Sequence, residues 1–235
     1  MSTHAGSDLV VAIDGPSGSG KSSVSRAVAR ELGVGFVDTG ATYRAVTWWC
    51  LDRGIDLTDR RSVAAAALSL PLELSTDPAG ITVVVDGTDV TAAIRESRVS
   101  EAVSTVATNL DVREILVRRQ RELIGDTVAA TGGCVAEGRD VTTVVQPTAD
   151  VRILLTASVE ARLARRATEL HGAADTDSLA ATRDQVVRRD RDDSTVSSFL
   201  TAGEGVVTVD TSELDFGGSV AAVLEVVQAV VGARR

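Results

Sequence analysis

Lysine, cysteine and aromatic residues are all scarce in this chain, and each shortage limits the kinds of core, crosslink or motif that the chain can contain. Aromatic residues make up only 3% of its 235 residues, so Val, Ala, Leu and Ile must fill the core, as is typical of α/β proteins with parallel strands buried on both faces. The two cysteines, Cys50 and Cys134, are too few for a disulfide framework, and no histidine or cysteine stands near them at metal-ligand spacing. We expect two reduced, mostly buried thiols.

A long apolar run, a leader peptide and a basic balance are also missing from the sequence. We identify no run of membrane-spanning length and no charged-then-apolar N-terminal segment, and therefore expect a cytoplasmic protein without a membrane partner. The net charge of −9 argues against a nucleic-acid partner, which would require a basic face. Lys21 is the single lysine among 24 cationic residues, so a motif that depends on lysine can stand at only one place.

Short apolar runs alternate with helical patterns along most of the chain. Strands are predicted at residues 9–13, 34–37, 135–136, 151–155 and 205–209, and helices at 21–32, 41–51, 97–108, 112–130, 159–170, 181–189 and 220–231. This alternation predicts an α/β fold with a parallel sheet covered by helices on both faces. Residues 1–7 are expected to form a disordered tail, and residues 58–98 a small inserted antiparallel subdomain.

A phosphate-binding motif stands between the first predicted strand and the first predicted helix. The segment Gly-Pro-Ser-Gly-Ser-Gly-Lys-Ser at residues 15–22 matches G-x-x-x-x-G-K-[ST] at every fixed position. Its glycines let successive backbone N–H groups form an anion-binding nest, and the following helix adds the positive end of its dipole. Lys21 is expected to reach the β- and γ-phosphates of ATP, and the Ser22 hydroxyl to ligate Mg²⁺. The predicted ATP-binding residues are Gly15, Pro16, Ser17, Gly18, Ser19, Gly20, Lys21, Ser22 and Ser23.

This motif fixes a nucleoside triphosphate but leaves the type of enzyme open. A GTPase of the Ras type reads guanine with Asn-Lys-x-Asp, which cannot occur where Lys21 is the only lysine. A motor ATPase would need longer sensor elements and usually more chain. A kinase with a separate acceptor site is the interpretation that remains, and a P-loop module that binds ATP without turnover is the alternative.

Two further segments complete a family pattern. These are Asp-Thr-Gly-Ala-Thr-Tyr-Arg at residues 38–44 and Ala-Glu-Gly-Arg-Asp at residues 136–140. Together with the P-loop, they make residues 9–231 resemble the bacterial cytidylate kinase family. The resemblance implies a P-loop kinase with a five-stranded parallel sheet in residues 8–57 and 99–235, a lid around residues 157–200, and a monophosphate-binding insertion at residues 58–98. It also implies a monomer that transfers the γ-phosphoryl group of Mg·ATP to CMP or dCMP, with UMP, AMP or another small acceptor as the alternative.

The resemblance assigns the acceptor site residue by residue. It implies that Thr39, Arg44 and Arg139 surround the acceptor phosphate, that Ser104, Arg113 and Asp140 read the base, and that Arg189 and Asp193 hold the ribose. Cytosine offers an amino donor beside acceptors at N3 and O2, so an aspartate and an arginine suit it and oppose uracil. Ser104 and Arg113 can converge only if the helix between them breaks, and Asn109 is a good N-cap for a second helix.

Three arginines are predicted to act from the lid. Arg162, Arg165 and Arg166 follow the i, i+3, i+4 spacing of one helix face, and the resemblance implies that they neutralise charge on the transferred group. Asp38 is a candidate for holding Mg²⁺ through a water molecule, with a structural carboxylate at the strand end as the alternative.

One segment departs from the family pattern. Members of the family usually read Arg-Asp-x-x-Asp-Ser-x-Arg with a Pro-Leu shortly after. Here Val196 occupies the place of the second arginine, and Phe199-Leu200 follows without the proline. Because valine cannot contact a phosphate as arginine does, we hypothesise reduced acceptor affinity with activity retained.

Overall fold

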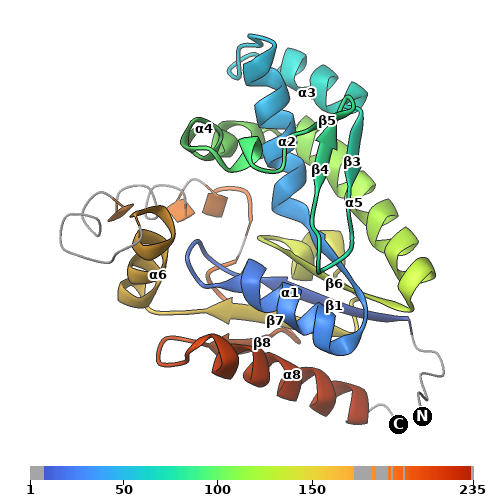
Figure 1. The fold of residues 1–235 in the computed structure, drawn as a ribbon, viewed down its shortest axis with the longest axis vertical. Coiled ribbons are helices and arrows are strands. Elements are labelled where there is room, and N and C mark those ends of the chain that lie inside the picture. The colour runs from blue at the N-terminus through green and yellow to red at the C-terminus, as the bar shows by residue number, and fades with distance from the viewer. Residues whose placement is uncertain (1–7, 172–181, 184–189, 192, 198, 234–235) are drawn as a thin grey trace.

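The structure is a computed structural model that describes residues 8–171, 182–183, 190–191, 193–197 and 199–233 (Figure 1). The expected tail at residues 1–7, most of the expected helix at 181–189, and Arg189 lie outside the described residues.

Five parallel strands form the central sheet, in the order β2-β6-β1-β7-β8. Their bounds are β1 (Leu9–Asp14), β2 (Gly35–Asp38), β6 (Gly133–Gly138), β7 (Val151–Thr156) and β8 (Val207–Asp210). The predicted five-stranded parallel sheet is therefore confirmed. The edge strands are β2 and β8, and β1, with the P-loop at its end, is the central strand.

Helices cover both faces of this sheet, which explains why its strands are apolar at nearly every position. On one face α1 (Lys21–Leu32) and α8 (Phe216–Ala233) pack against Val11 and Ile13 of β1. On the other face, Ala12 packs with residues of α5 (Leu110–Thr131) and of a π-helix, Val141–Val145. The two cysteines are buried and unpaired, and burial raises the pKa of Cys50 to about 11 and that of Cys134 to about 12.

The last helix, α8, is apolar along most of its length. By length and composition alone α8 could cross a membrane, which corrects the expectation that no apolar segment is long enough. Its Val220, Val223 and Val227 pack into the core with α1 and the sheet. Core packing therefore accounts for the apolar character of one face of this helix, of which 22% is buried.

A second layer of structure lies beside the sheet, at the top of Figure 1. It contains α2 (Thr39–Asp52), α3 (Arg60–Ser69), α4 (Ser97–Ala107), a 3₁₀-helix (Ala93–Arg95) and the strands β3 (Leu72–Leu74), β4 (Val83–Val85) and β5 (Thr88–Asp89). The three strands are antiparallel, as expected, and the buried valines of β4 join a separate apolar cluster with α2, α3 and α4. The helix α3 was not predicted, although Asp59 caps it by accepting from two backbone N–H groups. The limits of an inserted subdomain stay a prediction.

Local signals explain where the elements near the P-loop end. Helix α1 has the predicted bounds and stops at Gly33, which adopts φ 67° in the left-handed region. Asn109 caps α5 by accepting from the N–H groups of Asp111 and Val112, so the chain breaks between α4 and α5 at the predicted place. Helix α6 (Val159–His171) follows β7.

Candidate active site

The P-loop connects β1 to α1 and is shaped by close packing. Gly18 and Gly20 adopt φ 76° and 84°, in the left-handed region that favours glycine. A Cβ atom on Gly18 would lie 2.5 Å from the carbonyl oxygen of Arg162, so a side chain is excluded there. At the start of the loop, the Asp14 carboxylate accepts from the backbone N–H groups of Val141 and Thr142, both at 2.8 Å. This anchors the end of β1 to the π-helix.

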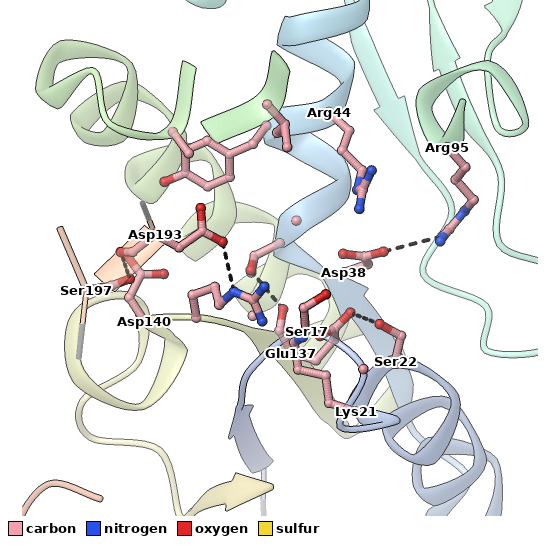
Figure 2. A pocket seen from close by; sticks show the side chains of 18 of the residues that line it. Ser17, Lys21, Ser22, Asp38, Arg44, Arg95, Glu137, Asp140, Asp193 and Ser197 are labelled. Atoms are coloured by element: carbon pink, nitrogen blue, oxygen red, sulfur yellow. Dashed lines mark hydrogen bonds and ion pairs between the residues drawn. The ribbon is translucent and has the colours of Figure 1, made fainter. Parts of the chain in front are cut away.

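A cavity of about 360 Å³ opens from the P-loop toward the second layer (Figure 2). It lies at the carboxyl ends of β2 and β6, where open α/β sheets bind ligands. The sequence-predicted residues that line it are Ser17, Gly18, Gly20, Lys21, Ser22, Ser23, Asp38, Thr39, Arg44, Arg113, Arg139, Asp140, Arg166 and Asp193. Gly15, Pro16, Ser19, Ser104, Arg162 and Arg165 do not line it, although all six are described.

One corner of the cavity is suited to a divalent cation. The Ser22 hydroxyl donates to Glu137 Oε1 at 2.6 Å, and Glu137 Oε2 is buried without a hydrogen-bond partner in the described part of the chain. Burial and then the charge of Asp38 raise the pKa of Glu137 to about 7, against the opposing charge of Lys21. An orphaned carboxylate oxygen beside the P-loop serine fits a cation ligand.

The described residues contain no cluster of three or more His, Cys, Asp or Glu that could hold a metal by itself. Mg²⁺ is usually bound by one or two carboxylates, water and substrate phosphates. Sequence reasoning missed Glu137, although it directly precedes Gly138 within the segment 136–140 that carried the family resemblance.

Several guanidinium groups gather at the predicted acceptor-phosphate corner. Figure 2 shows Arg44 and Arg95 extending toward Asp38 from above, with Lys21 and Ser22 on the opposite side. Burial lowers the pKa of Arg44; Asp38 opposes this, whereas Arg95, Arg166 and Arg139 add to it. Such a concentration of guanidinium groups favours the binding of an anion.

Arg95 is a residue of this corner that the sequence did not single out. It belongs to the 3₁₀-helix and forms an ion pair with Asp38 at 3.5 Å, with 50% of its side chain exposed against 12% for Asp38. Asp38 also caps α2 by accepting from the Ala41 N–H at 2.9 Å, so it serves the structural role considered for it. Arg44 donates to Ser100 Oγ at 2.9 Å and to Ile94 O at 3.4 Å, which ties it to the same segment.

The predicted base-reading end lies between α4, α5 and β6. Arg113 forms an ion pair with Asp140, and both side chains are largely buried, at 13% and 5% exposure. Burial raises the pKa of Asp140, and Arg113 opposes this by stabilising the carboxylate. The Tyr43 hydroxyl is buried beside this pair without a hydrogen-bond partner among the described residues, and burial raises its pKa. A buried, paired aspartate and arginine with an unused hydroxyl can recognise a polar ring edge.

A chain of polar contacts joins this end of the cavity to the P-loop. Ser104 Oγ donates to Asp193 Oδ1 at 3.1 Å, and Arg139 Nε donates to Asp193 Oδ2, also at 3.1 Å. Arg139 also donates to the carbonyl oxygen of Gly15 and lies 4.7 Å from the centroid of the Phe199 ring. Phe199, which stands near the place of the family's proline, is thus a packing partner of Arg139. Thr39 Oγ1 donates to Glu137 O at 2.8 Å.

The side chains of the three arginines predicted to share one helix face make different contacts. Arg162 pairs with Asp190 and donates to Ser17 O at 3.0 Å. Arg165 donates to Thr211 Oγ1 at 3.0 Å and to Ser19 O at 3.3 Å, beside the P-loop. Arg166 lines the cavity, as does Val196.

Comparison with known proteins gives one consistent family. The family model described as cytidylate kinase matches residues 11–229. The cytidylate kinase of Streptomyces griseus is 47% identical over 209 residues, covering 88% of this chain and 87% of the relative. That of Cutibacterium acnes is 48% identical over 222 residues, with 94% and 96% covered. That of Rhodococcus jostii is 47% identical over 228 residues, with 97% and 98% covered.

The solved structures add little. A shikimate kinase from Acinetobacter baumannii aligns over 96% of this chain and 94% of its own, at 15% identity and a TM-score of 0.42. That likeness is too weak to inform function.

Proposed function

The chain belongs to the cytidylate kinase family, and from this premise we propose that it transfers the γ-phosphoryl group of ATP to CMP or dCMP, giving ADP and CDP or dCDP. Its relatives named cytidylate kinase are 47–48% identical to it over most of its length. One observation carries the choice of acceptor: the buried Arg113–Asp140 pair lies at the far end of a cavity that begins at the P-loop.

The donor would be held by the P-loop. Backbone N–H groups of the loop and the N-terminus of α1 bind the phosphates, and Lys21 contacts the β- and γ-phosphates. Ser22, Glu137 and Asp38 would hold Mg²⁺, directly or through water. The ion that these residues would hold would supply positive charge to neutralise the charge that develops on the phosphates.

The acceptor phosphate would bind among Arg44, Arg95 and Arg139. A phosphate dianion competes well for Arg95, because the ion pair of Arg95 with Asp38 is long and half exposed. Its arrival would release the Asp38 oxygen that pairs with Arg95, while the other oxygen keeps its cap on α2. Thr39, at the N-terminus of α2, lies on the same side and fixes the end of β6.

The base would be recognised by the Arg113–Asp140 pair. Asp140 accepts from the N4 amino group of cytosine, and Arg113 donates to N3 and O2. Uracil would set an oxygen against the Asp140 carboxylate and leave buried polar groups unmatched, which discriminates strongly. Ser104 belongs to the same base-reading set, and its hydroxyl also donates to Asp193. Asp193 would hold the ribose together with Arg189, which lies outside the described residues.

The transfer itself needs positioning and charge stabilisation more than covalent help. An oxygen of the acceptor phosphate attacks the γ-phosphorus, the bond to the β–γ bridging oxygen breaks, and ADP leaves. Lys21, Arg166 and Arg162 stabilise charge on the transferred group, and a closed cavity keeps water from accepting it. A cytoplasmic, monomeric enzyme with no nucleic-acid or membrane partner belongs to the same proposal.

A coupled assay of ADP release tests this function. Purified protein is given Mg·ATP with CMP, dCMP, UMP, AMP, GMP or no acceptor. We expect turnover led by CMP and dCMP. Turnover led by another acceptor would contradict the base-reading proposal while leaving the donor site intact. No turnover with any acceptor, together with ATP binding, would indicate a P-loop module without catalysis.

A further inference from the structure

A buried carboxylate rests on the P-loop, and the proposed function gives it no role. Asp190 is only 6% exposed, and its Oδ1 accepts from the backbone N–H of Ser17 at 3.0 Å. Its other oxygen forms an ion pair with Arg162, and Arg139 lies 3.7 Å from Oδ1. An anionic group therefore occupies an N–H donor of the loop that we assign to the phosphates of ATP.

The contacts around Asp190 involve both backbone polar groups of Ser17, the N–H and the carbonyl. Arg162 donates to Ser17 O at 3.0 Å, so Asp190 and Arg162 together satisfy the N–H and the carbonyl of one loop residue. The close fit at Gly18, described above, also holds the backbone of α6 at Arg162 against the loop. Arg139 approaches from β6 and donates to Gly15 O. Two guanidinium groups and one carboxylate thus meet at the first half of the P-loop.

This arrangement treats the two nucleotides of the reaction differently. The γ-phosphoryl group of ATP brings negative charge to the P-loop close to Asp190. Like charges that lie close together repel each other strongly where water is excluded. ADP brings no γ-phosphoryl group and has no need to displace the carboxylate. Arg162 and Arg139, in contrast, attract either anion.

We propose that Asp190 is a positioning residue that stands in for the γ-phosphoryl group when no triphosphate is bound, and gives way when ATP arrives. In the empty enzyme it keeps Arg162 and Arg139 at the loop. With ATP bound, the Arg162 guanidinium passes from the carboxylate to the γ-phosphoryl oxygens, and Arg139 is left to bind the acceptor phosphate. Asp190 thereby sets the relative affinity for ATP and ADP, an inference that rests on the proposed donor site.

The test measures the dissociation constants of Mg·ATP and Mg·ADP by calorimetry for the wild type and for Asp190→Asn. Asparagine keeps the size, and its single carbonyl oxygen can still accept from the Ser17 N–H, but it removes the charge and the second acceptor, which faces Arg162. We expect the ratio of ATP to ADP affinity to rise by about tenfold, with kcat falling while the KM for ATP also falls. A purely structural role would lower the melting temperature and leave this ratio unchanged, which would overturn the proposal.

Asp193→Asn is the matched control, because it makes the same change in the same segment and also removes a charge partner of Arg139. It should weaken CMP binding and leave the ATP to ADP ratio within about twofold of the wild type. Asp190→Glu, which keeps the charge, should not raise the ratio. Asp190→Ser, which removes the charge with a smaller side chain, carries the same expectation as Asp190→Asn and serves if that variant fails to fold.

The outcomes also separate the two proposals. A wild-type protein that binds neither nucleotide would overturn both the donor site and the role of Asp190. If the wild type phosphorylates CMP but the ratio of ATP to ADP affinity does not rise in Asp190→Asn and Asp190→Ser, the role of Asp190 alone would be overturned.

Discussion

The carboxylate of Glu137 accepts a hydrogen bond from the Ser22 hydroxyl at 2.6 Å, although 115 residues separate the two in the chain. The contact joins the end of β6 to the first turn of α1, so a strand end and the P-loop meet at the corner assigned to Mg²⁺. The remaining oxygen of Glu137 is buried without a partner among the described residues.

Glu137→Gln tests the metal corner. The amide can still accept from Ser22, but it is a far poorer ligand for Mg²⁺ or for its water shell. We expect kcat to fall by about a hundredfold and the Mg²⁺ concentration needed for tight ATP binding to rise severalfold, measured by calorimetric titration. Glu122→Gln changes an exposed glutamate of α5 and should alter neither quantity. Unchanged Mg²⁺ dependence in Glu137→Gln would remove Glu137 from the metal site.

The same residue predicts a pH dependence of stability for the metal-free protein. The folded protein raises the pKa of Glu137 from 4.5 to about 7, so it favours the protonated carboxyl. This contribution to stability is full below pH 4.5 and is lost as the pH rises through about 7. The melting temperature of the wild type should therefore decline between pH 5 and 8, whereas that of Glu137→Gln should decline less over the same range. Parallel curves for the two proteins would contradict the prediction.

Arg95→Ala tests the contribution of the 3₁₀-helix to the acceptor site. Loss of a guanidinium that can bind the acceptor phosphate should raise the KM for CMP by about tenfold and leave ATP binding unchanged, as steady-state kinetics and calorimetry would measure. Arg98→Ala is the control, because Arg98 lies three residues later and pairs on the surface with Glu96 at 2.8 Å. Equal effects of the two variants would argue against a phosphate contact by Arg95.

Asp140→Asn tests base recognition. The amide can turn its N–H₂ group toward a carbonyl, so the preference for an amino group at the ring edge is lost. We expect kcat/KM for CMP to fall by about a hundredfold and the ratio of UMP to CMP activity to rise. The panel assay with both acceptors measures this ratio. A uniform loss for CMP and UMP would indicate that Asp140 only holds Arg113 in place.

Val196→Arg tests the departure from the family pattern. Val196 lines the cavity, so an arginine there can reach the acceptor phosphate. The KM for CMP should fall by severalfold in initial-rate measurements. If it stays the same or rises, the valine does not weaken acceptor binding.

Much of the fold could be predicted because local signals and the sheet pattern agreed. Gly33 ends α1 at the predicted residue, and the Asn109 cap separates Ser104 from Arg113 onto two helices at the predicted place. The helix α3 was missed because its alanine run, Ala64 to Ala67, has no polar-apolar period to read.

The parts of the site that were missed depend on tertiary contacts. The pairings of Glu137 with Ser22 and of Arg95 with Asp38 join segments 115 and 57 residues apart, and neither follows from a spacing rule. Likewise, helical spacing placed Arg162, Arg165 and Arg166 on one face but could not say that Arg165 would turn to the carbonyl groups beside β8. The roles of the predicted site residues remain predictions.

Lys21 lines the cavity and is the only lysine of the chain. An amine-selective reagent such as an activated ester therefore has a single ε-amino target in the whole protein, apart from the α-amino group. Covalent labelling at that position would report directly, molecule by molecule, whether the nucleotide site is free, and protection by ATP would count the sites that are filled. The chain thus has a built-in means of active-site titration by mass spectrometry, with no engineered probe.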